Sequence, residues 1–246
     1  MEDNMNNRKL LEQIEGILNQ IPKEQREHFE KYFQNAPDAL LRTINIERRS
    51  VNKVLVEENE PIEKIYILMK GTVKAVDFRV RGSAYEFARF DGFTVLGSME
   101  CMFGMQNYMT TLITATPCIL LSIPREAYEN WIARDINALR TDAESLRVNL
   151  LERSRENRIM FLLNGMERLV YLLVKVCESR GEAEEYLLPV NRQELAEQSG
   201  SSVKTVNRSM KSLEESGFLT RVGHKVKITK SQYASMREYL ELILKG

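Results

Sequence analysis

Apolar residues recur at helical spacing in the first part of the chain and at strand spacing after it. Between residues 8 and 34, Leu10, Ile14 and Ile17 lie three or four positions apart, and Pro22 divides this stretch into two predicted helices. From about residue 40 to residue 123, short runs rich in Val, Ile, Thr, Phe and Tyr are separated by turn residues. Several short strands with no helix between them predict an antiparallel roll or barrel.

The alternation of apolar residues places individual strands. The clearest runs contain Ile65, Ile67 and Met69 before Gly71, and Ile119, Leu121 and Ile123 before Pro124. Within residues 72–80 the alternation changes phase, which predicts a β-bulge near residues 75–76. Pro124 is suited to the first turn of the helix that follows.

A helix without Gly or Pro is predicted over residues 134–160. Its apolar positions step by 3, 4, 3 and 4 residues, as in the a/d seam of a coiled coil. They are Ile136, Leu139, Ala143, Leu146 and Leu150. We interpret this seam as the contact between two copies of the chain in a homodimer. The alternative is a helix packed on its own domain, because Val148 and Leu151 add a second apolar stripe.

Residues 190–219 have the pattern of a helix-turn-helix. Asn191 and Glu194 resemble a capping box, Gly200 suits a tight turn with positive φ, and Ser202 can cap a second helix. One face of the second helix is apolar (Val206, Met210, Leu213), and the other carries Lys204, Asn207, Arg208 and Lys211. Such a helix fits the major groove of DNA. The alternative is an ordinary amphipathic helix with a basic solvent-facing side.

A hairpin with its turn at Gly223-His224 is predicted next, which makes the segment a winged helix. Its cations Arg221, Lys225 and Lys227 are placed to meet phosphates, unless they only increase solubility. The chain has 35 basic and 35 acidic residues, yet residues 201–230 hold seven basic and two acidic ones, a net charge of +5. A basic patch confined to one end suits a polyanionic partner.

Length and composition narrow the remaining classes of protein. The 246 residues suffice for two modest domains. No apolar run approaches the roughly 20 residues of a membrane span, and the polar N-terminus predicts no secretory signal. Three widely spaced cysteines fit a reducing cytoplasm. We expect neither a metal cofactor nor enzymatic activity, because catalytic triads, Walker loops and metal-ligand spacings do not occur in the sequence.

The segments described so far resemble the family of the cyclic-AMP receptor protein and the fumarate–nitrate regulator (CRP/FNR). The resemblance covers about residues 40–230 and is carried by IYILMKG, LGSMECMFGMQNYMTT, SIPREAYENWI, the long helix and RQELAEQSGSSVKTVNRSMKSLEESGFL. It implies an α+β fold: a cyclic-nucleotide-binding-like antiparallel β-roll, a long dimerisation helix and a C-terminal winged helix-turn-helix. The expected boundaries are 1–133 for the N-terminal helices and roll, 134–163 for the dimerisation helix and 164–246 for the DNA-binding domain.

The resemblance further implies a transcription regulator that binds two-fold symmetric double-stranded DNA as a homodimer. Its half-sites are expected about 34 Å apart, and RNA polymerase is a candidate partner. The expected DNA contacts are Ser202, Val203, Lys204, Asn207, Arg208, Lys211, Arg221, Lys225 and Lys227. Cyclic-AMP-type members place Arg and Glu where Val203 and Lys204 stand here. We therefore expect a different operator sequence with the same symmetry.

The sequence departs from cyclic-nucleotide-binding members of the family in the Gly-led cassette, which is the segment LGSMECMFGMQNYMTT at residues 96–111. Those members carry a Glu after the Gly for the ribose hydroxyl, and an Arg-Ser pair for the cyclic phosphate. Here Ser98 follows Gly97, and Tyr108-Met109 stand at the Arg-Ser position. A buried phosphate without its guanidinium loses its bidentate, charge-assisted partner. We expect an effector other than cAMP, or alternatively a constitutive DNA-binding protein with a vestigial pocket.

The expected effector pocket has few candidate ligands for a prosthetic group. Its residues are Gly97, Ser98, Met99, Tyr108, Met109, Arg153 and Ser154, the last two reached by counting along the long helix. Nearby methionines predict either an apolar ligand site or a pocket filled by side chains. The first 100 residues hold no cysteine for an iron–sulfur cluster, and we interpret Cys101 as a small buried apolar residue.

Overall fold

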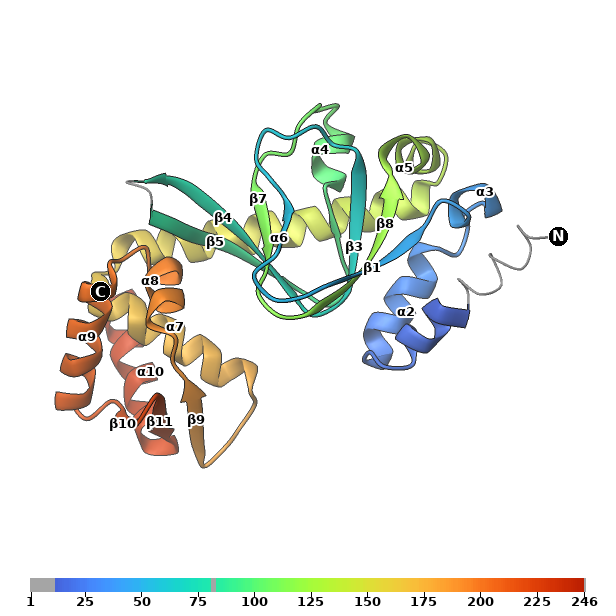
Figure 1. Ribbon diagram of the computed structural model, residues 1–246. Helices are drawn as coiled ribbons and strands as arrows, with labels where there is room; N and C mark the ends of the chain where they lie inside the picture. Colours follow the sequence, from blue (N-terminus) through green and yellow to red (C-terminus); the bar gives the residue numbers. More distant parts are fainter. Residues whose placement is uncertain (1–11, 81–82, 246) are drawn as a thin grey trace. The chain divides into compact units, whose positions relative to one another are not determined.

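The alternating runs between residues 40 and 124 form two four-stranded antiparallel sheets that make up a β-roll (Figure 1). The computed structural model describes residues 12–80 and 83–245, except for the side chains of 79, 80, 83, 148–157 and 245. One sheet has the order β1 (Asn45–Arg49), β8 (Cys118–Pro124), β3 (Lys64–Lys70), β6 (Thr94–Leu96). The other has the order β2 (Val54–Val56), β7 (Thr111–Thr114), β4 (Thr72–Val80), β5 (Ser83–Asp91).

The centre of the roll is the pairing of β3 with β8. Ile65 lies opposite Ile123 and Ile67 opposite Leu121, and all four side chains are fully buried. The prediction of a β-bulge near residues 75–76 is wrong, because β4 pairs with β7 without a register shift from Val73 to Val76. Both faces of β4 are buried there, so the change of phase in the sequence reflects burial on both sides.

Helices cover the ends of the roll. Residues 12–18 are helical, and α2 (Lys23–Tyr32) and α3 (Asp38–Leu41) precede the first strand. Within the cassette, α4 (Ser98–Met102) lies at one end of the roll, and α5 (Arg125–Ile132) follows β8 (Figure 1). Pro124 lies at the N-cap of α5, one position before the predicted first turn. Tyr32 and Trp131 join α2 to α5 through an edge-to-face contact with ring centroids 5.0 Å apart.

The long helix α6 runs over Ile136–Leu162, close to the predicted range. Asp135 caps it, because its Oδ1 atom accepts hydrogen bonds from the backbone N–H groups of Asn137 and Ala138. Among the predicted seam residues, Ile136 and Ala143 are exposed, while Leu139 and Leu146 are half-buried. Leu150 belongs to the helix, but its side chain lies outside the described residues.

The C-terminal part packs around one apolar core. It contains α7 (Gly165–Ser179), β9 (Glu185–Pro189), α8 (Arg192–Ser199), α9 (Val203–Glu215), β10 (Thr220–Val222), β11 (Lys225–Thr229) and α10 (Lys230–Lys245). The wing sheet has the order β10-β11-β9. β9 and α10 extend the winged helix beyond the predicted elements, and Tyr186, Leu188, Met236 and Leu240 contribute to its core.

The chain divides into two compact units. One comprises Met1–Asp77 and Ala88–Glu152, and the other comprises Phe78–Phe87 and Arg153–Gly246. The tip of the β4–β5 hairpin therefore groups with the winged helix. Over residues 12–80 and 83–245, every helix lacks the combination of length and apolar content needed to cross a bilayer.

Candidate DNA-binding and effector sites

The turn and capping residues predicted for the helix-turn-helix have the geometry that their types favour. Gly200 adopts φ +60° between α8 and α9. The Ser202 side chain caps α9, because its Oγ atom accepts a hydrogen bond 3.1 Å long from the backbone N–H of Thr205. Asn191 likewise caps α8 by accepting from the backbone N–H groups of Gln193 and Glu194. Short-range interactions thus fix where both helices begin.

The two faces of α9 differ as predicted. Val206, Met210 and Leu213 are fully buried in the core of the winged helix. Lys204, Asn207, Arg208 and Lys211 are exposed, and Val203 is half-buried against the core. Among the described residues, Lys204 and Arg208 have no ion-pair partner, whereas Lys211 Nζ lies 3.6 Å from Glu215 Oε1. The face away from the core therefore presents one amide and two cations that have no ion-pair partner within residues 12–80 and 83–245.

The wing cations differ in their environments. Arg221 is held against α9: its backbone N–H donates to Glu214 Oε1 at 3.0 Å, and its guanidinium pairs with Oε2 of the same carboxylate. These hydrogen bonds lower the pKa of Glu214. Lys227 Nζ lies 3.1 Å from Glu185 Oε2, while Lys225 is exposed and has no ion-pair partner in the described part of the chain.

Arg168 is a positioning residue that the sequence pattern did not identify. Its Nε atom donates to the carbonyl oxygens of Met160 at 2.8 Å and Leu163 at 3.0 Å, at the end of α6. Its guanidinium also donates to the carbonyl of Ser199 at 3.2 Å, at the end of α8. One side chain thus donates hydrogen bonds to carbonyl groups at two helix ends, where partners within the helix are missing. It fixes the last turn of α6 against the helix-turn-helix.

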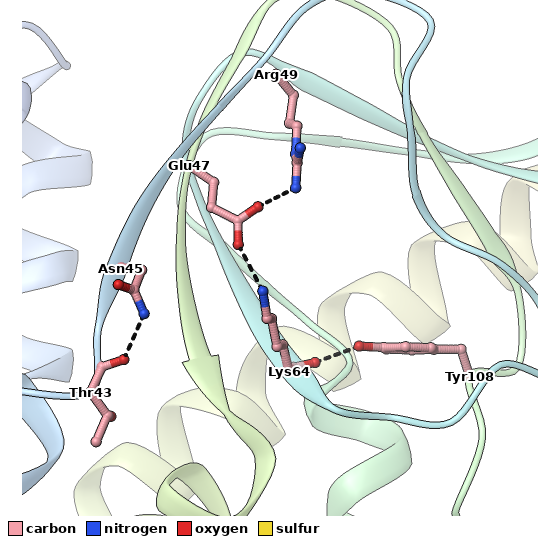
Figure 2. A network of polar contacts seen from close by, with 6 residues as sticks. All are labelled: Thr43, Asn45, Glu47, Arg49, Lys64 and Tyr108. Carbon is pink, nitrogen blue, oxygen red and sulfur yellow. Dashed lines mark hydrogen bonds and ion pairs between the residues drawn. The ribbon is translucent and has the colours of Figure 1, made fainter.

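The cassette residues of the predicted effector pocket are used largely for packing. Gly97 adopts φ +89°, and a Cβ atom there would lie 3.2 Å from both the Tyr108 ring and Ile65 Cδ1. Tyr108 is only 5% exposed, and its hydroxyl donates to the backbone carbonyl of Lys64 (Figure 2). Ser98 is 2% exposed and lies in the interior of the unit. The residues that replace the family's polar ligands therefore fill space within the roll.

A charged network surrounds this end of β3. The Glu47 carboxylate pairs with Arg49 and with Lys64, whose Nζ atom lies 3.4 Å from Glu47 Oε1 (Figure 2). Partial burial opposes ionisation of Glu47, but a hydrogen bond with Ser122 and the neighbouring cations outweigh it and lower the pKa of the carboxyl group. Lys64 and Arg49 therefore have this carboxylate as an ion-pair partner within the roll.

The apolar cassette side chains point outward more than the sequence suggested. Met99 is 37% exposed and Met109 51%. Thr110 contributes a buried Oγ1 atom that has no hydrogen-bond partner among the described residues. Burial raises the pKa of the Cys101 thiol to about 12, which fits its interpretation as a small apolar residue. Arg153 and Ser154 belong to α6, but their side chains lie outside the described residues.

Comparison with protein families identifies both parts of the chain. The model of the cyclic nucleotide-binding domain matches residues 48–135, and that of the Crp-like helix-turn-helix domain matches residues 167–233. The chain belongs to the CRP/FNR family. It is a transcription regulator of the CRP/FNR type, with a domain of the cyclic-nucleotide-binding fold and a DNA-binding helix-turn-helix. The predicted family and fold class are thereby confirmed.

Solved structures of CRP/FNR regulators have the same fold. The c-di-GMP-responsive global regulator CLP of Xanthomonas campestris matches with a TM-score of 0.71 and 19% identity over 82% of this chain and 98% of that chain. FixK2 of Bradyrhizobium japonicum matches with a TM-score of 0.64 and 16% identity, over 79% and 96% of the two chains. A CRP/FNR regulator of Thermus thermophilus matches with a TM-score of 0.66 and 19% identity, over 80% and 98%. No curated protein matches the sequence.

Proposed function

We propose that this CRP/FNR regulator binds a two-fold symmetric operator as a homodimer and responds to an effector other than cAMP. The face of α9 with Lys204 and Arg208, which have no ion-pair partner in the part of the chain that the structure describes, carries the proposal. Its opposite face is anchored in the core by Val206, Met210 and Leu213. An Arg side chain can bond guanine O6 and N7, and Asn207 can bond adenine N6 and N7. Lys225 and Lys211 are proposed to contact phosphates.

The proposed dimer contact is the N-terminal half of α6. Ile136 is 56% exposed, although it is a large apolar residue at an a/d position. Ala143 is exposed on the same seam, which leaves room for a second helix. We retain the boundaries 134–163 for the dimerisation helix and 164–246 for the DNA-binding domain as part of this proposal.

Selection from a random pool of DNA tests operator symmetry. We expect the full-length protein to enrich inverted repeats with half-sites about one helical turn apart, because a two-fold dimer presents two α9 helices to successive major grooves. The enriched sites should differ from those of cyclic-AMP-type regulators where Lys204 replaces Glu. Sequencing of the bound fraction measures both properties, and a pool enriched in single, unrepeated sites would contradict the proposed dimer.

Titration calorimetry tests the proposed exclusion of cyclic nucleotides. We expect no binding of cAMP or cGMP at millimolar concentration, because Tyr108 and Met109 stand at the sequence positions of the family's Arg-Ser pair, and the Tyr108 ring packs beside Gly97. A buried cyclic phosphate would remain unpaired at a large cost in free energy. Micromolar binding of cAMP would contradict this part of the proposal and leave the DNA-binding part intact.

A constitutive DNA-binding protein with a filled sensor pocket is the second candidate. It is favoured by the burial of Tyr108 and Ser98, which leaves few polar groups of the cassette accessible to a ligand. The Thr110 hydroxyl, which lacks a partner among the described residues, favours the first candidate, since an effector could supply its hydrogen bond. Repeating the DNA selection with and without a small-molecule cell extract distinguishes the two, because only a switched regulator should change its affinity.

A further inference from the structure

A carboxylate on α6 is buried among hydroxyl groups from neighbouring helices. Asp142 is 1% exposed. Its Oδ2 atom accepts a hydrogen bond of 3.1 Å from the hydroxyl of Tyr32 on α2, and another from the hydroxyl of Tyr128 on α5. Its Oδ1 atom has no hydrogen-bond partner among the described residues. One oxygen of this carboxylate therefore accepts two hydrogen bonds, while the other is buried without a hydrogen-bond donor among the described residues.

The cassette lies next to this cluster, because its helix α4 contacts α5. Ser98 on α4 acts on the Tyr128 hydroxyl in the direction that lowers its pKa, while the Ser98 hydroxyl itself donates to the backbone carbonyl of Val95 at 3.5 Å. The hydrogen bonds of Tyr32 and Tyr128 to Asp142 connect α2 and α5 to the N-terminal half of α6. All of these residues belong to the same compact unit.

Within the described residues, no cation neutralises this carboxylate. The titratable groups that face Asp142 are Tyr32 from α2 and Tyr128 from α5, and the uncharged Ser98 on α4 acts on Tyr128. Trp131 packs edge-to-face on both tyrosine rings and keeps the surroundings apolar. A buried charge with two neutral donors and no counter-ion is costly to ionise.

The balance between burial and hydrogen bonding fixes the proton affinity of Asp142. Burial favours the neutral acid more than the two tyrosine hydroxyls favour the anion, and the pKa of Asp142 rises to about 6. An unfolded chain releases this proton near pH ~4. The folded state therefore binds the proton more tightly, so the stability contributed by protonation is complete below about pH 4 and is lost as the pH rises through about 6.

We propose that Asp142, Tyr32 and Tyr128 form a proton-responsive latch that holds α2 and α5 more firmly against α6 when Asp142 is neutral. The neutral acid removes the cost of a buried charge and can still accept the two tyrosine hydrogen bonds. This proposal adds regulation by protons to the proposed function and does not depend on the operator or the effector.

Infrared difference spectroscopy of the full-length protein tests the latch directly. We expect a protonated carboxyl C=O band that appears as the pH falls from about 7.5 to about 4.5, with a midpoint near pH 6, and that is missing in Asp142→Asn. The matched control is Asp135→Asn, which removes another buried carboxylate from the start of α6 and should keep the band. If the wild-type protein shows no such band, or if the band survives in Asp142→Asn, the latch is refuted.

Two further variants separate a latch from simple packing. Tyr32→Phe and Tyr128→Phe each remove one donor to Asp142, so each should move the midpoint of the band above that of the wild type. A tyrosine that only fills space would leave the midpoint unchanged, and that result would also overturn the proposal. These measurements remain decisive if Asp142→Asn fails to fold.

Urea unfolding supplies the thermodynamic readout. Trp131 is the only tryptophan of the chain and packs on both tyrosines, so its fluorescence follows this unit. Relative to Asp142→Asn, the folding equilibrium constant of the wild type should fall on the order of tenfold per pH unit between about pH 4 and pH 6, and level off above. Parallel pH profiles of the two proteins would contradict the latch.

Discussion

Replacing Lys204 and Arg208 together by alanine is expected to weaken binding to the selected operator on the order of 10²–10³-fold. Side-chain contacts with base edges are worth about 1–3 kcal/mol each, and both residues lie on the exposed face of α9 without ion-pair partners among the described residues. Fluorescence anisotropy with a labelled operator at fixed salt concentration measures the loss. Because neither side chain is buried, helical content and thermal stability should stay unchanged.

The control for this variant removes the same charge elsewhere in the same unit. Lys230 and Arg237 are exposed on α10, where they pair with Glu184 and Glu241. Their double replacement by alanine lowers the net charge equally but leaves α9 and the wing intact. We expect a loss of a few-fold at most, which higher salt should remove. Equal losses in the two double variants would reduce the role of α9 to general electrostatic attraction.

The winged helix could be predicted because its signals are local. Ser202, Gly200 and the spacing of Val206, Met210 and Leu213 each specify backbone conformation or burial within a few residues. The structure places these residues at a cap, a positive-φ turn and a fully buried face. The basic face follows directly, since a helix with one face in the core must turn the opposite face away from it.

Elements that depend on tertiary pairing were harder to predict. β9 follows a polar loop, and its strand is specified by pairing with β11, in which Leu188 lies opposite Val226. The incorrect bulge in β4 has a related origin, because two buried faces mimic a change of register in sequence alone.

The helix α10 begins with a capping box: Thr229 Oγ1 accepts from the backbone N–H of Gln232, and Gln232 Oε1 accepts from the backbone N–H of Thr229. This local signal, with the buried stripe of Tyr233, Met236 and Leu240, was present in the sequence and was overlooked.

In the candidate effector site, the types of residue in the sequence were not enough to predict the contacts that these residues make in the folded chain. Counting along the cassette put Ser98 and Tyr108 at the family's ligand positions, yet residue type did not reveal which groups these hydroxyls would bond. The Tyr108 hydroxyl donates to the backbone of β3, and the Ser98 hydroxyl donates to the backbone carbonyl of Val95 on β6. The Asp142 cluster was missed for the same reason: its members are separated by up to 110 positions in the chain.

The sharpest stability prediction concerns Gly71, the single residue between β3 and β4. It adopts φ +101°, and a Cβ atom there would lie 2.5 Å from the carbonyl oxygen of Pro117 and 2.8 Å from Cys118 Sγ. Since the nearest atom is backbone, Pro117 and the start of β8 would have to move away from the end of β3. We expect Gly71→Ala to lower the free energy of unfolding of this unit by about 3–5 kcal/mol, from backbone strain and overpacking together.

Gly104→Ala separates the two causes. Gly104 also has a positive φ, +68°, but apart from its chain neighbours no heavy atom of the described residues lies within 4 Å of its added Cβ. Backbone strain alone should then cost about 1–2 kcal/mol. Urea unfolding followed by Trp131 fluorescence measures both variants in the same unit. The difference between them reports the collision with β8, so equal destabilisation would mean that the connection between β3 and β4 relaxes and that the contact with Pro117 does not constrain the roll.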